Sequence, residues 1–376
     1  MKRRTLSFWT KLFVGLAILT PFIIVCFLKP FHSLETKASM HTPQSLKFLE
    51  KSLHPGSQPS SRFPPRPPLP PRPHWSRVDP DHLYYGNPHI SLRKSTEMMK
   101  QKITNNIPDL DQVVTLTPEL REFLSKPPIN RHNYRYIYNP RDTCKRRKVD
   151  ILFVVPSEPI NSFRRRKVRK SSLYSYTSDE ANNAALLFFT GVPSPDSRNG
   201  GNIRENIDGE SDEHGDIVQQ DFVDVYRHLR LKAVSMLQWA ATFCFTAKYV
   251  IRTDDDVEVN VTDIVSAINR IGEQHADFVL GQIVENRLVA RSNQSKYFVS
   301  HEEYPEVTWP PFALGGLLGY PVTTVRLLYE AALRVPPVWL DDVYITSFCR
   351  EHVNVTLLSD PAFTFTELNP LDFNKQ

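Results

Sequence analysis

Apolar runs of strand length alternate with helical segments through the second half of the chain, and this alternation restricts the possible folds more than any other feature. Residues 149–156 are apolar apart from Asp150, which is typical of a strand covered on both faces. Further strands are expected at 184–191, 249–251 and 278–283, helices at 163–176, 225–244 and 263–274 and beginning near Pro321, and a loop at 193–215. Strands that alternate with helices predict a mostly parallel α/β sheet with helices on both faces.

Three consecutive carboxylates follow the short strand expected at 249–251, namely those of Asp254, Asp255 and Asp256. In an open α/β sheet, ligands bind beyond the carboxyl ends of the strands. Adjacent carboxylates repel one another, so a partly buried cluster needs a cation, and oxygen ligands select a hard ion such as Mn²⁺ or Mg²⁺. An acidic turn facing solvent is the alternative, but the apolar strand in front of it favours a functional site.

Two further segments near the C-terminus contain candidate functional residues. Gly315 and Gly316 follow a proline- and aromatic-rich stretch, where they allow either a close backbone approach to a ligand or a tight turn before the next helix. Asp341 and Asp342 follow Trp339 at an expected helix start, where acidic residues often serve only as caps. The sequence has no Gly-x-Gly-x-x-Gly after the first strand and no Walker A motif, so a dinucleotide site or P-loop is not expected.

An apolar segment near the N-terminus predicts a membrane anchor. Residues 8–28 reach the length of a membrane span, and no small-residue cleavage site follows them. Basic residues precede the segment, so the positive-inside rule places residues 1–7 in the cytosol and the rest of the chain in the lumen or outside. A cleaved signal peptide is the alternative and would also export the chain. Both interpretations exclude a nuclear role, and no nucleic-acid partner is expected.

The region after this segment has the composition of a spacer. Residues 29–80 are polar and rich in proline, and 61–73 are expected to be an extended polyproline II segment. Two of its motifs match SH3 ligands, so a membrane-anchored adaptor is an alternative function, although it requires the opposite topology. Residues 81–142 are interpreted as a partly ordered segment before the main domain, with a helical turn or two expected at 118–124.

Cysteines and glycosylation motifs agree with an exported chain. An oxidising compartment permits one disulfide among the three cysteines beyond the anchor, without indicating which two pair: Cys144, Cys244 and Cys349. Three Asn-x-Ser/Thr motifs are predicted to accept N-linked glycans: Asn260, Asn293 and Asn354.

The ordered motifs from Cys144 to the C-terminus resemble the β-1,3-galactosyltransferase and β-1,3-N-acetylglucosaminyltransferase family of Golgi type II glycosyltransferases. Arg165-Arg-Lys-Val-Arg169 is similar to the family's Arg-x-x-Ile-Arg, and the block 215–232 to its Asp-Ile-x-x-x-Asp-Phe-x-Asp-x-Tyr segment. Asp254-Asp-Asp-Val-x-Val-Asn260, Pro310-Pro-Phe-x-x-Gly-Gly316 and Asp341-Asp-Val-Tyr344 complete the series. The chain departs from the family at Ser171-Ser172 in place of Thr-Trp, at His228 in place of Asn and at Asp341 in place of Glu, which leaves the donor sugar open.

The resemblance implies a GT-A, Rossmann-like catalytic domain over residues 143–376 in a single-pass type II protein of the Golgi membrane. The implied reaction is an inverting β-1,3 transfer of galactose, GlcNAc or GalNAc. The sugar moves from a UDP-sugar to the 3-hydroxyl of an acceptor glycan on protein or lipid. A catalytically silent, glycan-binding relative is the alternative, although retention of the three catalytic aspartates argues against it.

The resemblance also implies a role for each candidate residue. Asp254 and Asp256 would hold Mn²⁺ or Mg²⁺, and Asp342 would be the general base. The remaining candidates fall into two groups, those near the donor and those that line the substrate pocket: Arg165, Arg169 and Asp255 in the first, and Gly315, Gly316, Trp339 and Asp341 in the second.

Overall fold

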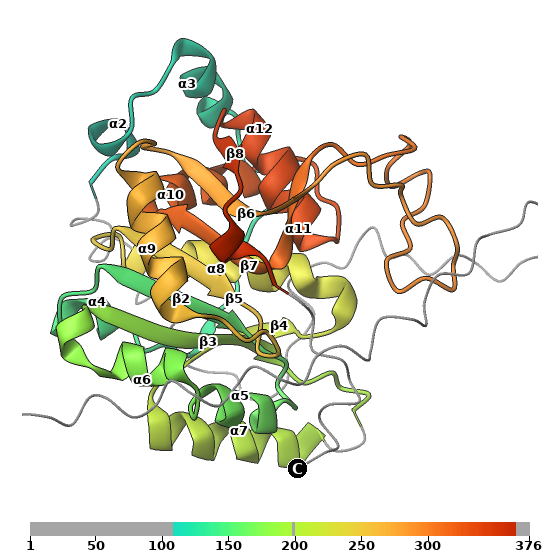
Figure 1. The fold of residues 1–376 in the computed structure, drawn as a ribbon. Coiled ribbons are helices and arrows are strands. Elements are labelled where there is room, and N and C mark those ends of the chain that lie inside the picture. The colour runs from blue at the N-terminus through green and yellow to red at the C-terminus, as the bar shows by residue number, and fades with distance from the viewer. Residues whose placement is uncertain (1–107, 198–199, 366–376) are drawn as a thin grey trace, which may run out of the picture. The chain divides into compact units, whose positions relative to one another are not determined.

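The computed structural model describes residues 108–197 and 200–365 (Figure 1). The predicted anchor at 8–28 and the proline-rich spacer at 29–80 lie outside these residues. No helix within the described residues is long and apolar enough to cross a membrane.

The described residues form one eight-stranded sheet in the order β1-β4-β3-β2-β5-β7-β6-β8. The strands are β1 (Tyr136–Tyr138), β2 (Ile151–Pro156), β3 (Ala184–Val192), β4 (Ile217–Val223), β5 (Tyr249–Thr253), β6 (Phe278–Val284), β7 (Phe312–Pro321) and β8 (Thr356–Leu358). Strands β4, β3, β2 and β5 run parallel, whereas β7 is antiparallel to both of its neighbours, β5 and β6. The sheet is therefore mixed, with its parallel part as predicted.

The strand register fixes the position of the candidate site. Ile151 of β2 pairs with Ala184 of β3 on one side and with Tyr249 of β5 on the other. Because these strands are parallel, their carboxyl ends meet at one edge of the sheet. The segments that follow β2 and β5, which begin at Ser157 and Asp254, therefore lie at the same edge.

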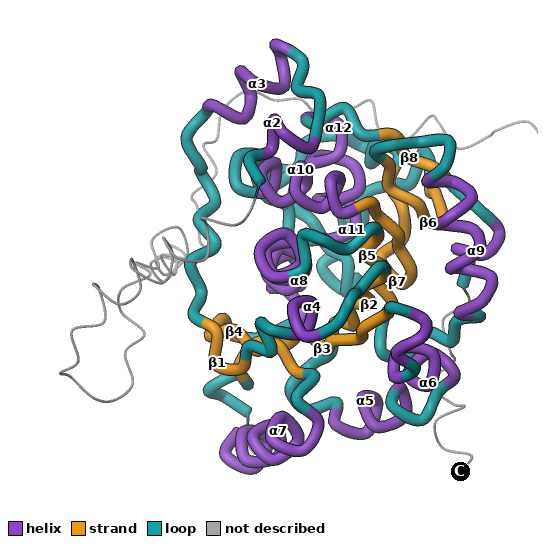
Figure 2. Tube along the Cα trace, turned by 90° about the vertical axis from the view of Figure 1, so that its left-hand side faces the viewer, coloured by secondary structure: helices purple, strands orange, loops and turns teal. Residues whose placement is uncertain are grey.

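Helices cover both faces of the sheet (Figure 2). The described helices of four or more residues are α2 (Leu110–Val113), α3 (Pro118–Ser125), α4 (Thr143–Arg146), α5 (Ser162–Val168), α6 (Ser172–Ser178), α7 (Gly200–His214), α8 (Leu229–Phe243), α9 (Val261–Gly272) and α10 (Val322–Ala332), followed by a C-terminal helical stretch made of α11 (Asp341–Val343), a π-helical segment (Tyr344–Cys349) and α12 (Arg350–His352). Helices α8 and α10 and the C-terminal stretch pack on one face, and α6 and α9 on the other.

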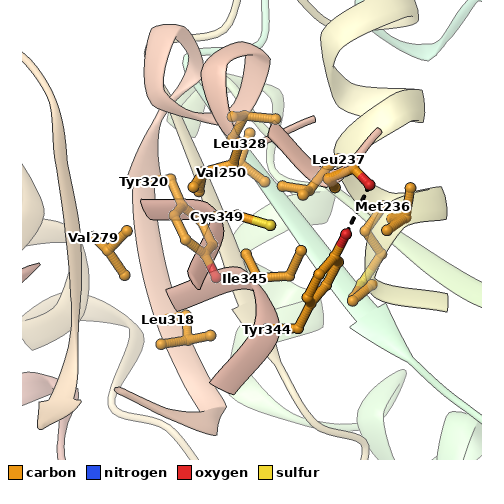
Figure 3. Packing of buried hydrophobic residues seen from close by; sticks show 14 of the residues in the cluster. Met236, Leu237, Val250, Val279, Leu318, Tyr320, Leu328, Tyr344, Ile345 and Cys349 are labelled. Carbon is orange, nitrogen blue, oxygen red and sulfur yellow. Dashed lines mark hydrogen bonds between the residues drawn. The ribbon is translucent and has the colours of Figure 1, made fainter. Parts of the chain in front are cut away.

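Alternate residues of β2 supply both hydrophobic layers, as expected from the two-residue period of a strand. Leu152 and Val154 belong to the cluster with α8 and α10, whereas Phe153 belongs to the cluster with α6 and α9. In the first cluster, Tyr344 packs near Met236 (Figure 3). Its hydroxyl lies 2.8 Å from the carbonyl oxygen of Ala332. This contact joins the C-terminal stretch to α10 just beyond Asp341 and Asp342.

Two sequence-based predictions of local structure were wrong, and one of the two alternatives for Gly315 and Gly316, a tight turn, is excluded. The expected loop at 193–215 contains the fifteen-residue helix α7, which buries Ile203 and Ile207 one turn apart. The predicted helix at 163–176 is two helices, because the hydroxyl of Ser171 caps the start of α6 at the amide of Tyr174. Gly315 and Gly316 form no turn and have no positive φ, since both lie inside β7.

The described cysteines are arranged as one disulfide and one free thiol. Cys144 in α4 is bonded to Cys244, the residue directly after α8, and Cys349 is free and buried. This agrees with the prediction of one bridge among three cysteines and identifies the pair. On the N-terminal side of residue 143, α3 confirms the helical turns expected at 118–124, and β1 pairs with β4.

Candidate active site

The first carboxylate of the acidic cluster is positioned by two neighbouring strands. Asp254 follows β5 directly, and its amide donates a hydrogen bond of 3.0 Å to the carbonyl oxygen of Gly316 in β7. Burial raises the pKa of Asp254 to about 6, and the negative charges of Asp341 and Asp256 add to the shift while Arg252 opposes it. A cation at this position would relieve that electrostatic cost.

Arg252 joins the two acidic clusters, which are Asp254–Asp256 after β5 and the pair Asp341 and Asp342. Arg252 was not identified as a site residue from the sequence. Its guanidinium group donates to Asp341 at 2.6 Å and to Asp254 at 3.2 Å. The Arg252 side chain is only 8% exposed, so these contacts form inside the protein. A signal was available in the sequence, because an arginine inside an apolar strand needs a carboxylate partner.

Asp341 and Asp342 are adjacent in sequence but differ in their surroundings. Asp341 is buried and paired with Arg252, whereas Asp342 is half-buried and accepts a hydrogen bond of 2.8 Å from the amide of Val343. Among the described residues, Asp342 has no ion pair. Burial raises the pKa of Asp342 to about 7, helped by the charges of Asp341 and Asp254 and opposed by the Val343 amide and Arg252. A carboxylate with this pKa can accept a proton near neutral pH.

The other two residues of the acidic cluster share one arginine. Arg164 of α5 lies 3.0 Å from Oδ1 of Asp255 and 2.7 Å from Oδ2 of Asp256. The second oxygen of Asp255 accepts a hydrogen bond of 2.7 Å from the hydroxyl of Ser157. Asp255 is therefore directed toward β2 and α5, while the Asp256 side chain is 38% exposed. Neither Arg164 nor Ser157 was identified from the sequence.

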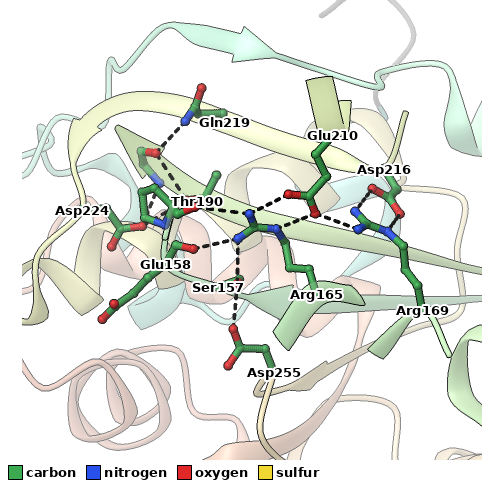
Figure 4. Close-up of polar contacts among 12 residues, drawn as sticks. Ser157, Glu158, Arg165, Arg169, Thr190, Glu210, Asp216, Gln219, Asp224 and Asp255 are labelled. Atoms are coloured by element: carbon green, nitrogen blue, oxygen red, sulfur yellow. Dashed lines mark hydrogen bonds and ion pairs between the residues drawn. The ribbon is translucent and has the colours of Figure 1, made fainter. Parts of the chain in front are cut away.

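Arg165 and Arg169 lie in a buried ion-pair network rather than on a solvated helix face (Figure 4). Both pair with Glu210 of α7 at 2.7 Å, and Arg169 also pairs with Asp216 at 2.7 Å. Arg165 reaches Ser157 at 3.1 Å, which connects the network to Asp255. These contacts give both arginines protein partners, and their contact with a donor stays a prediction.

The residues predicted to line the substrate pocket lie close to the same edge. A Cβ atom at Gly315 would come within 3.1 Å of the Arg252 guanidinium, and one at Gly316 would come within 2.3 Å of the Phe365 ring. The glycines thus allow close approach of protein groups. Trp339 is buried, and its indole donates to the carbonyl of Phe298 at 3.1 Å. Their contact with a substrate stays a prediction.

The three predicted glycosylation sites are all exposed. Asn260 accepts a hydrogen bond from the Asp263 amide at the start of α9, Asn293 lies in the segment between β6 and β7, and Asn354 adopts a left-handed conformation with φ of 51°. Each side chain is therefore open to solvent, as a modified asparagine must be.

The carboxylates at this edge suit a hard metal ion whose coordination is completed by oxygen atoms of a substrate. Within residues 108–197 and 200–365 no group of three or more His, Cys, Asp or Glu side chains converges in a metal-binding arrangement. Asp254 and Asp256 are 35% and 38% exposed and supply two carboxylates. Mn²⁺ and Mg²⁺ commonly take few protein carboxylates and fill the remaining positions with water and substrate phosphates. The two carboxylates of Asp254 and Asp256 therefore fit such an ion as its protein ligands.

The sequence model of a family described as Galactosyltransferase matches residues 163–361, which include both acidic clusters. Human lactosylceramide 1,3-N-acetyl-beta-D-glucosaminyltransferase is 29% identical over 228 residues, which are 59% of this chain and 59% of that protein. Human beta-1,3-galactosyltransferase 9 is 24% identical over 275 residues, 73% of each chain. This chain thus matches about three fifths of the length of the human lactosylceramide enzyme. A Pyrobaculum calidifontis mannosyltransferase, solved with GDP-Man and Mn²⁺, is 13% identical and has a TM-score of 0.36 over 67% of this chain and 63% of that one, a likeness too slight to carry an argument.

Proposed function

The chain belongs to the galactosyltransferase family, and we propose that it is an inverting β-1,3-glycosyltransferase with a GT-A fold that uses a UDP-sugar. The observation that carries the proposal is that two adjacent carboxylates, those of Asp341 and Asp342, differ in their ion pairing. Arg252 neutralises Asp341, whereas Asp342 has no ion pair among the described residues and a pKa raised to about 7. One group is therefore structural, and the other can exchange a proton.

In the proposed reaction, Asp342 accepts the proton of the acceptor 3-hydroxyl as that oxygen attacks the anomeric carbon of the donor sugar. The new carbon–oxygen bond forms on the face opposite to the departing UDP, and the bond to UDP breaks in the same step, which inverts the configuration. Asp254 and Asp256 would hold Mn²⁺ or Mg²⁺, which would supply positive charge to the leaving diphosphate. Asp255, fixed by Ser157 and Arg164, keeps the acidic segment in place.

The relatives suggest which substrates to examine. Their printed names describe transfer of N-acetylglucosamine to lactosylceramide and β-1,3 transfer of galactose. We therefore propose galactose, GlcNAc or GalNAc as the transferred sugar and a glycolipid or glycoprotein glycan as the acceptor. The sequence motifs shared with the family do not distinguish these donor sugars. The sugars differ in a single hydroxyl or N-acetyl group, which an enzyme recognises by the shape of its pocket.

We place the catalytic domain in the Golgi lumen, anchored by residues 8–28. The disulfide between Cys144 and Cys244 supports a compartment that is oxidising, since cytosolic proteins rarely keep structural disulfides. The exposed asparagines of the three glycosylation motifs are consistent with that location.

A donor panel tests the proposed function. The full chain in detergent is incubated with UDP-galactose, UDP-GlcNAc or UDP-GalNAc and with lactosylceramide or a glycoprotein glycan, with and without Mn²⁺. We expect transfer from one donor, dependent on acceptor and metal, with a β-1,3 linkage in the product. If the folded chain transfers no sugar from any donor to any acceptor, the catalytically silent relative becomes the better account.

A further inference from the structure

A polar pocket lies at the edge of the sheet opposite to the candidate active site. Its volume is about 330 Å³, and its lining includes Tyr138, Asn139, Arg141, Asp142, Arg146 and Ser211. Tyr138 ends β1, and Ile217, which also lines the pocket, begins β4. Asp254, in contrast, follows the carboxyl end of β5, a strand that runs in the same direction as β4. The two sites therefore lie at opposite ends of the parallel strands.

The backbone around this pocket is fixed by contacts to the core. Cys144, inside the pocket-forming segment, is bonded to Cys244 after α8. The side-chain oxygen of Asn139 accepts a hydrogen bond of 2.9 Å from the indole of Trp239, and the Thr143 hydroxyl donates to the Pro140 carbonyl at 2.7 Å. Because these contacts hold the segment in one conformation, a ligand would not have to order it.

Two arginines of the pocket differ from the basic residues that follow them in the sequence. The Arg147 guanidinium donates to two backbone carbonyls, and Lys148 pairs with Asp150 at 3.0 Å. The exposed guanidinium groups of Arg141 and Arg146, in contrast, have no hydrogen bond or ion pair to another described residue. In the basic run 141–148, the arginines that line the pocket thus keep their donors available to a ligand.

The lining combines groups that bind acids with groups that bind hydroxyls. A guanidinium fork matches the two oxygens of a carboxylate or sulfate. Asp142 and Ser211 can bond sugar hydroxyls, and within the lining itself two guanidinium groups stand against one carboxylate. Beside the pocket, Oδ1 of Asp208 accepts a hydrogen bond of 2.6 Å from the Tyr138 hydroxyl. The volume lies at the lower end of the range for small-ligand pockets and suits one sugar residue.

We propose that this pocket is a second glycan-binding site that takes an acidic sugar, bearing sulfate or carboxylate, at the edge of the sheet opposite to the acidic clusters. Such a site would hold a glycan without taking part in the transfer reaction. It can therefore be measured in the absence of a donor sugar, and the result is independent of the proposed enzymatic activity.

The test measures oligosaccharide binding to the full chain in detergent by calorimetry. The probes are a sulfated heparin tetrasaccharide, a hyaluronan tetrasaccharide that carries only carboxylates, and neutral chitotetraose. The variant Arg141→Gln/Arg146→Gln removes both pocket guanidinium groups. The matched control Lys126→Gln/Arg131→Gln removes the same charge from two exposed residues outside the pocket lining.

We expect one of the two acidic probes to bind more tightly than the neutral one, and its affinity to fall by at least about tenfold in the pocket variant, as expected for lost charged hydrogen bonds. The control variant should bind as the native chain does, and the melting temperatures should agree, because the altered side chains are exposed. An equal loss in both double variants would overturn the proposal, as would unchanged binding in the pocket variant. If neither acidic probe binds more tightly than chitotetraose, the proposal is overturned as well.

Discussion

Arg252 donates a hydrogen bond of 2.6 Å to Asp341, and this contact separates the roles of two neighbouring carboxylates. The Arg252 side chain is only 8% exposed, so its guanidinium group holds the Asp341 carboxylate in place inside the protein. Asp342, the next residue, has instead a pKa raised to about 7. Because Arg252 also contacts Asp254, the same side chain aligns the acidic segment after β5 with the start of α11.

Replacing Arg252 with methionine should lower the free energy of unfolding by about 3–5 kcal/mol, because the change leaves Asp341 without its buried partner. Urea denaturation of the native and Arg252→Met chains measures this difference. Arg270→Met is the control, since Arg270 pairs with Asp360 but is 56% exposed, and its loss should cost at most about 1 kcal/mol. Equal effects of the two substitutions would show that the buried pair contributes no special stabilisation.

Asp342→Asn should increase stability at alkaline pH, although it removes the proposed base. The pKa of Asp342 is raised by burial from 3.8 to about 7, so the folded chain binds this proton more tightly than the unfolded chain. The resulting stabilisation is complete below about pH 4 and is lost as the pH rises through about 7. Asparagine cannot ionise and avoids this loss.

Urea unfolding in EDTA at about pH 8 and at about pH 5 tests this linkage. The Asn variant should exceed the native chain in free energy of unfolding at the higher pH, and by less at the lower pH. If the two chains differ in free energy of unfolding by the same amount at both pH values, Asp342 does not titrate between them.

The disulfide should stabilise the catalytic domain strongly, because Cys144 and Cys244 are 100 residues apart. The chain-entropy argument predicts about 4–5 kcal/mol for a loop of this length. Cys144→Ala/Cys244→Ala should lower the melting temperature, and peptide mapping of the unreduced native chain should find these two cysteines linked and Cys349 alkylated. A linked peptide that contains Cys349 would contradict the observed pairing.

N-linked glycosylation tests the predicted topology. If the catalytic domain is lumenal, peptide N-glycosidase should increase the mobility of the chain expressed in secretory cells. Asn293→Gln and Asn354→Gln should each remove one glycan, since both asparagines are exposed. Absence of a glycan from all three motifs, including Asn260, would contradict the lumenal assignment and leave the cytosolic adaptor as an alternative.

Much of the fold and the family could be predicted from the sequence. The ordered motifs identified the family, which the match over residues 163–361 confirms. The alternation of apolar runs and helices predicted the strands now seen as β2, β3, β5 and β6, because local hydrophobicity determines which segments are buried. The position of the acidic cluster after β5 followed from the same pattern.

What the sequence did not reveal depends on contacts between distant segments. Helix α7 was hidden by its glycine-, asparagine- and aspartate-rich composition, although Ile203 and Ile207 form its buried face. Strand β7 contains two adjacent glycines whose missing side chains are explained only by Arg252 and Phe365 packing above them. Likewise, the pairing of Arg165 with Glu210 joins residues 45 positions apart, and no local pattern indicates such a partner.

Sugar transfer by the Asp342→Asn chain is the measurement that tests the central claim most directly. With the donor, acceptor and metal that support turnover by the native chain, kcat should fall by at least about 100-fold, because the proton of the acceptor hydroxyl loses its base. The KM for the UDP-sugar should change little, and the control Asp263→Asn, at an exposed residue, should leave kcat unchanged. If Asp342→Asn keeps a kcat within a few-fold of the native value, Asp342 is not the base and the proposed assignment of the two carboxylates is wrong.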